Sequence, residues 1–318
     1  MNLHYADAEA LLSRILTAAG LTQAEREPCI HEILDAEWRG KTSYGLELVP
    51  MVVKWHRLKQ HDPRIVRDGP VQAFIEGGNS AGPVVAALAM NLALRKARET
   101  GIAIVGARNR WPWFVAGHQL RRAAAAGFVA LTWSAGVSIV APHGGSRPVF
   151  GTNPLGVAVP ATNGPIVFDT AMTAGPASAL RDAKQAGQPL PDGIALDARG
   201  RPTTDPDEAR KGALLPFGGH RGSGLAMMVE LLGGAWVGAK TGKAAGPRGF
   251  VILVASRDLF GFGDGLAGAA EGLIAEMRAA ADPPDAVHIP GRGVVDFARP
   301  ITVSDELHAA LSQLPSGA

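Results

Sequence analysis

A glycine-rich stretch that runs directly into an apolar segment constrains the fold more than any other part of this chain. Residues 217–234 read Phe-Gly-Gly-His-Arg-Gly-Ser-Gly-Leu-Ala-Met-Met-Val-Glu-Leu-Leu-Gly-Gly, and their apolar residues have helical spacing. Glycines let a backbone pass close to a ligand, and the start of a helix presents free N–H groups and the positive end of its dipole. The stretch therefore predicts a helix preceded by a basic pair, His220 and Arg221, and this glycine-rich segment either approaches a ligand or is a turn that only packs a core helix.

The composition is that of an ordinary globular protein. The 318 residues are 47% apolar and 19% charged, enough to bury a core in one large domain or two smaller ones. The formal net charge of +2 gives no broad electrostatic reason to expect nucleic acid or an acidic membrane as a partner. The single cysteine, Cys29, excludes an intrachain disulfide, and we expect it to be buried in a protein of the reducing cytoplasm. The sequence has no signal-peptide pattern and no apolar run of about 20 residues, so we expect no membrane span.

Short apolar runs alternate with segments of helical periodicity, which indicates an α/β protein. We expect helices over residues 6–37, interrupted near Gly20, and over residues 46–58, 83–99, 115–126, 225–237, 266–281 and 304–314. We expect strands over residues 71–75, 102–105, 129–132 and 249–256, with a strand-rich middle portion over residues 129–170. Thr22 and Glu25 have the spacing of a capping box at the start of the second helix. Residues 76–82 are expected to form a glycine turn, and residues 315–318 a mobile tail.

Several other segments follow the same order as in a known family. Residues 141–160 include Phe-Gly-Thr-Asn-Pro-Leu-Gly, residues 168–173 read Phe-Asp-Thr-Ala-Met-Thr, and residues 289–292 read Ile-Pro-Gly-Arg. Together with the glycine-rich stretch, they resemble the type-2 malate/L-lactate dehydrogenase family. That family includes ureidoglycolate and sulfolactate dehydrogenases and piperideine-2-carboxylate reductases. The resemblance runs along nearly the whole chain.

This resemblance implies an α/β fold with helices from both chain ends and a nicotinamide-binding sheet unlike the doubly wound dinucleotide fold. Consistent with that, no Gly-x-Gly-x-x-Gly directly follows an early strand. The resemblance also implies a central cofactor-binding α/β domain over residues 71–259 and a helical domain over residues 1–70 with 260–318. A homodimer acting on a small molecule is expected, with the active site near the subunit boundary.

The segments that hold the cofactor in the family match well here. By resemblance Thr152 lies next to the substrate. By resemblance the contacts to NADPH or NADH come from Asn153, Pro154, Asp169, Thr170, Ala171, His220, Arg221, Gly222, Pro290 and Arg292. Arg221 stands where the family has lysine and keeps the positive charge near the phosphates. Arg292 either binds phosphate or ribose or is a solvated surface charge.

The segment that carries the catalytic pair of the family differs. In relatives, a histidine beside a serine donates the proton, and an arginine four residues later binds the substrate carboxylate. Here Ser43 is present, Tyr44 takes the histidine position and Leu48 the arginine position. A tyrosine, with an ordinary pKa of about 10, is protonated at neutral pH and can donate a proton, whereas leucine cannot bind a carboxylate. Tyr44 is therefore either the proton donor, with Ser43 beside it, or an ordinary half-buried aromatic residue.

A second departure lies at residues 109–114, Asn-Arg-Trp-Pro-Trp-Phe, where the family has Asn-Ser-x-His-Phe-Gly. Arg110, Trp111 and Trp113 predict a bulky, partly cationic surface, while Phe114 replaces a glycine. Such a surface either shapes the substrate site or packs on a neighbouring subunit. We assign Trp113 to substrate binding.

A third departure lies at Ser178 and Ala179, which replace a Gly-Lys or Gly-Asp pair and leave no charged helper there. His118 and His143 lie near the altered segments and either take over acid–base work or are structural. We assign His118 to the substrate side of the site, together with Leu48.

These observations predict an NAD(P)H-dependent oxidoreductase that reduces a non-standard ketone or cyclic imine in a specialised biosynthetic pathway. A protonated iminium accepts hydride without a strong enzyme acid, so an imine substrate tolerates the loss of the histidine. The alternatives are a non-redox pseudoenzyme, an enzyme that uses the cofactor cleft for another ligand, and unchanged malate or lactate oxidation. No histidine pair has metal-ligand spacing, so no metal is expected.

Overall fold

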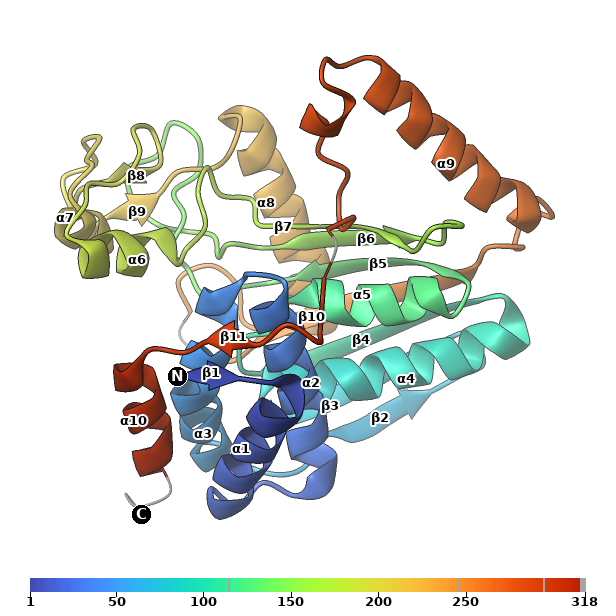
Figure 1. The fold of residues 1–318 in the computed structure, drawn as a ribbon, viewed down its shortest axis with the longest axis horizontal. Helices are drawn as coiled ribbons and strands as arrows, with labels where there is room; N and C mark the ends of the chain where they lie inside the picture. Colours follow the sequence, from blue (N-terminus) through green and yellow to red (C-terminus); the bar gives the residue numbers. More distant parts are fainter. Residues whose placement is uncertain (114, 245, 294, 315–318) are drawn as a thin grey trace.

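A seven-stranded sheet forms the centre of the molecule (Figure 1). The computed structural model describes residues 1–113, 115–244, 246–293 and 295–314. In spatial order, the strands are β2 (Arg64–Asp68), β3 (Gln72–Ser80), β4 (Ile102–Arg110), β10 (Arg248–Ser256), β5 (Phe128–Ser134), β6 (Leu155–Val159) and β7 (Ile166–Thr170). Only β3 and β4 run parallel, and every other neighbouring pair is antiparallel. A doubly wound dinucleotide fold has a mostly parallel sheet, so the expectation of a different α/β fold is confirmed.

Helices cover both faces of this sheet. On one face, α4 (Gly82–Thr100) and α5 (Ala116–Ala125) share a core with alternate strand residues such as Val105 and Ala107. The residue between these two faces the other way, because side chains alternate along a strand. There a Cβ on Gly106 would lie 2.9 Å from Val237, which ends the 3₁₀ turn η3 (Ala235–Val237) after helix α8 (His220–Gly233). The glycine thus lets that turn pack closely on the sheet.

The two ends of the chain meet in a second core. It joins α1 (Tyr5–Ala18), α2 (Gln23–Trp38), α3 (Val49–Arg57) and α10 (Asp305–Gln313), and β1 (Asn2–Leu3) pairs with β11 (Ile301–Thr302). The capping box is confirmed, since the Thr22 N–H donates a hydrogen bond of 2.9 Å to the Glu25 carboxylate. Cys29 is fully buried in this core, as expected.

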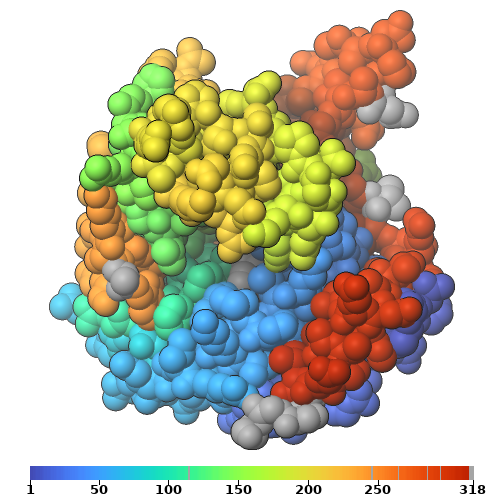
Figure 2. Space-filling model, turned by 90° about the vertical axis from the view of Figure 1, so that its left-hand side faces the viewer, coloured from blue at the N-terminus to red at the C-terminus, as the bar shows by residue number. Residues whose placement is uncertain are grey.

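A small lobe between β7 and α8 has a core of its own. It contains α6 (Ala179–Ala186), β8 (Ala195–Leu196), α7 (Pro206–Lys211) and β9 (Ala213–Leu214), and lies at the upper left of Figure 1. In Figure 2 this lobe, coloured yellow, lies above the blue N-terminal segments, and the surface between them is hollowed.

Two expected boundaries were wrong. Strand β3 continues to Ser80 instead of ending in a turn at residue 76. A Cβ on Gly77 would lie 2.7 Å from the Arg108 carbonyl oxygen, so this glycine allows two strands to approach. Helix α8 starts at His220, five residues before the predicted start at Leu225, and so includes most of the glycine-rich stretch.

The division into two domains stays a proposal. Strand β2 belongs to the sheet, although its residues fall within the range assigned to the helical domain. Helix α9 (Gly263–Ala279) lies at the upper right of Figure 1, away from α1, α2 and α3. The expected tail at residues 315–318 lies outside the described residues. Within the described ranges, no helix combines the length and apolarity needed to cross a membrane.

Candidate active site

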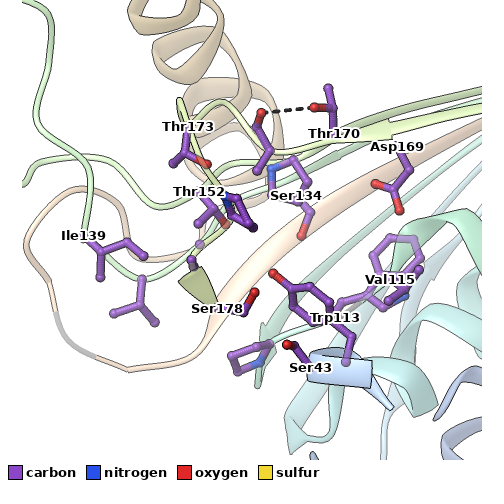
Figure 3. Close-up of a pocket in the computed structure, with 18 of the residues that line it drawn as sticks. Ser43, Trp113, Val115, Ser134, Ile139, Thr152, Asp169, Thr170, Thr173 and Ser178 are labelled. Atoms are coloured by element: carbon purple, nitrogen blue, oxygen red, sulfur yellow. Dashed lines mark hydrogen bonds between the residues drawn. The ribbon is translucent and has the colours of Figure 1, made fainter. Parts of the chain in front are cut away.

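A cavity of about 820 Å³ opens where β4, β5 and β7 end and β10 begins. Its walls come from the turn after α2, the ends of these strands and the first residues of the small lobe. Figure 3 shows Ser43 and Ser178 on one side of the cavity, Thr152, Thr170 and Thr173 on the other. A volume of this size is typical of small-molecule sites, which usually measure about 300–1,000 Å³.

Tyr44 lies in the lining of this cavity, at the end of the 3₁₀ turn η1 (Thr42–Tyr44). Burial raises the pKa of the Tyr44 phenol above its ordinary value, and the negative charge of Asp169 raises it further. The positive charge of Arg181 opposes this shift only in part. The Tyr44 phenol in the cavity wall is therefore protonated throughout the physiological range.

The turn that carries Tyr44 is fixed from below by a buried carboxylate. Glu37, near the end of α2, accepts a hydrogen bond of 2.8 Å from the Leu46 N–H. A Cβ on Gly45 would lie 1.9 Å from the Glu37 carboxylate oxygen, so a larger residue at this position would displace the carboxylate from its hydrogen bond to Leu46. At the mouth of the cavity, the Ser43 hydroxyl donates a hydrogen bond of 3.1 Å to Asp182. Asp182, one turn after Ser178, is thus a charged group close to the position where none was expected.

Asp169 joins the cavity to helix α5. Its carboxylate accepts a hydrogen bond of 2.7 Å from the Gly117 N–H in the first turn of α5, where a negative charge is favourable. A Cβ on Gly117 would lie 3.2 Å from this carboxylate, so the glycine permits the close approach. Burial raises the pKa of Asp169, while the charge of Lys41 and this hydrogen bond oppose the shift.

The Thr-Asn-Pro segment has one member behind the cavity and two in its wall. Thr152 and Pro154 line the cavity, whereas Asn153 is fully buried behind them. Thr170 and Ala171 also line it, next to Asp169. The structure therefore brings Ser43, Tyr44, Trp113, Thr152, Pro154, Asp169, Thr170 and Ala171 together around one cavity.

Residues 110–113 are buried or half-buried and form no exposed cationic surface, although Arg110, Pro112 and Trp113 line the cavity. Arg110 and Trp113 are only 2% and 6% exposed. The Trp113 indole packs in the core beside Phe250 and donates a hydrogen bond of 3.0 Å to Glu32. A buried indole N–H usually finds a hydrogen-bond partner, and for Trp113 the carboxylate of α2 supplies it. Phe114 lies outside the described residues.

The remaining predicted residues lie outside the cavity wall. Leu48 is half-buried in the turn before α3. The His118 ring is 3.7 Å from the Asp35 carboxylate, which also pairs with Arg39 and Arg121. The His118 ring thus lies among the polar contacts that join α2 to α5, and its assignment to the substrate side stays a prediction.

The other predicted cofactor residues lie in two further segments, the start of α8 and the C-terminal segment that contains Pro290 and Arg292. His220 and Arg221 are exposed, and the His220 ring centroid lies 6.2 Å from that of His143. A Cβ on Gly222 would lie 2.1 Å from the Phe217 carbonyl oxygen, so this glycine holds the turn against the helix. Arg292 pairs with Glu271 at 2.5 Å, and the Pro290 carbonyl accepts a hydrogen bond of 3.1 Å from the Val167 N–H. Arg292 is therefore ion-paired rather than freely solvated.

A nicotinamide dinucleotide fits the chemistry of these two regions. The Thr173 hydroxyl, buried in the cavity wall, has no hydrogen-bond partner among the described residues, so a ligand amide can supply one. At the start of α8, a Cβ on Gly218 or Gly224 would meet no atom within 4 Å, so the backbone is open to a bulky anion. Arg221 and the helix start provide the positive charge that a phosphate needs.

Two arginines of the cavity wall were given no site role of their own, although one alternative let the segment that contains Arg110 shape the substrate site. Arg110 ends β4 and Arg248 begins β10, and both line the cavity. The only signal for Arg248 was a charged residue at the start of an otherwise apolar strand. Across the described residues, no group of three or more His, Cys, Asp or Glu side chains is placed to hold a metal ion.

Comparison with known proteins gives one consistent result. The model of the malate/L-lactate dehydrogenase family matches residues 3–298. The chain is 38% identical over 243 residues to a Δ1-pyrroline-2-carboxylate/Δ1-piperideine-2-carboxylate reductase of Pseudomonas putida, covering 74% of this chain and 70% of the relative. It is 35% identical over 245 residues to a (2R)-3-sulfolactate dehydrogenase (NADP(+)) of Chromohalobacter salexigens, covering 74% and 72%.

The similarity extends to the fold. The structure of sulfolactate dehydrogenase from Methanocaldococcus jannaschii superposes with a TM-score of 0.88 at 26% identity, over 99% of this chain and 97% of that one. The chain therefore belongs to the malate/L-lactate dehydrogenase family.

Proposed function

We propose that this oxidoreductase uses NADPH or NADH to reduce a non-standard ketone or cyclic imine, with Tyr44 as the proton donor. The observation that carries the proposal is the position of Tyr44, a protonated phenol in the same cavity as Thr152 and Asp169. The cofactor supplies hydride when bound. The names of the relatives, an imine reductase and an NADP-linked dehydrogenase, support both halves of the proposal.

The residues of this chain have two tasks in the proposed reaction. Thr152, Thr170 and Thr173 present hydroxyl groups along one wall and orient the reacting carbonyl or imine. Tyr44 delivers a proton to the oxygen or nitrogen that gains electrons, as general acid catalysis requires. A cyclic imine that binds in its protonated form already carries this proton, so its reduction depends less on proton transfer from Tyr44. We place the reaction in specialised biosynthesis as part of the same proposal.

The cofactor would be held by two groups of residues. Asn153, Pro154, Asp169, Thr170 and Ala171 shape the wall behind the cavity, and His220, Arg221 and Gly222 form the start of α8. Both groups are joined through Asn153, whose amide donates hydrogen bonds to the Ala226 carbonyl and to Glu230 in α8. We assign the phosphates to the exposed helix start. The ion pair of Arg292 with Glu271 leaves this arginine a supporting role.

Cofactor binding and hydride transfer test the proposal directly. Purified protein should quench saturably in a fluorescence titration with NADPH or NADH. Nicotinamide deuterated at C4 should then transfer one deuterium to Δ1-piperideine-2-carboxylate or to another cyclic imine or ketone of a panel. If neither nicotinamide binds, the reductase is excluded and a non-redox use of the scaffold takes its place. If one binds without transfer to any imine or ketone, the proposed reaction is excluded.

We propose that the protein is a homodimer that pairs through α8. Leu225, Met228 and Leu231 recur every three residues on this helix and are 40%, 45% and 45% exposed, and Trp236 beyond it is 63% exposed. Contiguous exposed apolar side chains of this kind mark association surfaces. A second copy of the chain would cover them and lie close to the start of α8.

A further inference from the structure

Two arginines face each other across neighbouring strands at the edge of the cavity. Arg248 of β10 is the register partner of Arg110 of β4, and both side chains are 2% exposed. Like charges directly opposite each other in a sheet repel, and burial removes the water that would screen them. This arrangement is unfavourable unless a negative charge joins it.

Among the described residues, the two arginines hydrogen-bond only to neutral acceptors. Arg110 donates hydrogen bonds of 2.6 Å to the Ser134 hydroxyl, 3.0 Å to the Ala135 carbonyl and 2.7 Å to the Gly249 carbonyl. Arg248 donates one of 2.9 Å to the Gly242 carbonyl. Within the described part of the chain, neither arginine forms an ion pair with a carboxylate.

Three N–H groups of Arg110 and Arg248 lack a hydrogen-bond acceptor. Arg110 Nε, Arg248 Nε and Arg248 Nη1 are buried and have no hydrogen-bond partner among the described residues. The nearest carboxylates are already engaged, Glu32 with Trp113 and Glu230 with Asn153. Burial and the charge of Arg248 lower the pKa of Arg110 to about 9, which still leaves it positive at neutral pH. The two arginines in the cavity wall therefore lack both a compensating negative charge and hydrogen-bond acceptors.

We propose that Arg110 and Arg248 form the subsite that binds an oxyanion substituent of the substrate, a carboxylate or a sulfonate. A guanidinium offers two parallel N–H groups that match two oxygens of such a group. Both arginines line the cavity that contains Tyr44, so an oxyanion here would hold a substrate with its reducible carbon near the phenol. The inference rests on the proposed reductase function. In this proposal, the arginines at the ends of β4 and β10 bind the anion. They take over the task that the resemblance gives to an arginine at the position of Leu48.

Calorimetric titration with three probes on one ring tests the subsite. Benzoate, benzenesulfonate and benzamide differ only in the group that would meet the arginines. The wild-type protein should bind at least one of the two anions about tenfold or more tightly than the neutral amide, the ratio expected for charge-assisted hydrogen bonds. The better anion identifies carboxylate or sulfonate as the preferred group. Equal binding of all three probes, or no binding of either anion, would overturn the proposal.

Arg248→Gln removes the charge at the less engaged of the two positions. In this variant, we expect the preference for the anion over benzamide to fall to about threefold or less. Arg248→Lys should restore part of the preference, because lysine returns the positive charge but not the two parallel N–H groups of the guanidinium. Melting temperature, measured in parallel, should not fall, since removal of one of two facing charges relieves repulsion. Arg95→Gln, on the exposed surface of α4, is the matched control and should leave the anion preference unchanged.

The phosphates of the cofactor are the other source of negative charge, and titration with NADPH separates them. If Arg248→Gln weakens NADPH about tenfold and leaves the anion probes unchanged, the pair serves the cofactor and the substrate subsite is excluded. The probes are measured with and without NADPH. Anion binding without nicotinamide binding would refute the reductase but keep the subsite, so the two failures are distinguishable.

Discussion

The side-chain amide of Asn153 donates a hydrogen bond of 2.7 Å to the carboxylate of Glu230, and both residues are buried. This contact ties the segment behind the cavity to helix α8. The other side of the amide accepts a hydrogen bond of 2.9 Å from the Gly136 N–H, at the end of β5. Glu230 in turn accepts one of 2.8 Å from the Gly242 N–H. Four segments distant in sequence thus meet at one asparagine–glutamate pair.

Asn153→Ala should destabilise the fold by roughly 2–4 kcal/mol, because it leaves the Gly136 N–H and the Glu230 carboxylate without their buried partner. Urea denaturation monitored by circular dichroism measures the change. The cavity wall should loosen as well, so affinity for NADPH should fall together with stability. Gln188→Ala, at an exposed position of the small lobe, is the control and should change stability by less than about 0.5 kcal/mol. A loss of similar size in both variants would show that the buried pair contributes little.

The asparagine also shows which parts of the site were predictable. Its sequence context, Thr-Asn-Pro, identified a functional segment, but not which side chains face the cavity. Asn153 has a φ of +44°, a conformation that asparagine tolerates better than most residues, and this turns its side chain inward. Thr152 and Pro154, on either side of Asn153, then line the cavity. Hydrophobic periodicity does not indicate which side chain of such a segment turns inward.

The element types were predictable where periodicity is strong, as in α1, α2, α4 and β10. The extension of β3 through Gly77 was not, because a glycine that lets two strands approach looks like a turn glycine in sequence. Arg110 and Arg248 were not recognised as a pair, because only the register of β4 with β10, 138 residues apart in the chain, places them opposite each other. Tertiary pairing of this kind cannot be inferred from local spacing.

Tyr44→Phe should lower kcat for imine or ketone reduction by roughly 100- to 10,000-fold, the range that general acid catalysis contributes. The ring remains, so the affinity for NADPH should change less than about twofold. Tyr5, the other tyrosine of the chain, packs against Trp38 and Phe297 and is not part of the cavity lining, so Tyr5→Phe is the matched control. A loss of less than about tenfold in Tyr44→Phe would show that the proton does not come from this phenol.

The raised pKa of Tyr44 sets the direction of the pH dependence. A phenol donates only while protonated, and its pKa lies above the ordinary value because of burial and the charge of Asp169. We therefore expect the alkaline decline of kcat/KM for reduction to occur at a higher pH than the ordinary pKa of tyrosine, about 10, would give. The alkaline decline should be absent in Tyr44→Phe. A decline centred near pH 7 that persists in the phenylalanine variant would assign the titrating group to another residue.

Association through α8 predicts that a single charge can separate the subunits. Leu231→Asp places a carboxylate on the exposed apolar face formed by Leu225, Met228 and Leu231, where burial in an interface would strip it of water. Sedimentation velocity should show a dimer for the wild-type protein and a monomer for this variant. Leu58→Asp is the matched control, since Leu58 is also 45% exposed but lies just after α3, and it should sediment as the wild type. A dimer that survives Leu231→Asp, or one that Leu58→Asp separates, would move the interface away from α8.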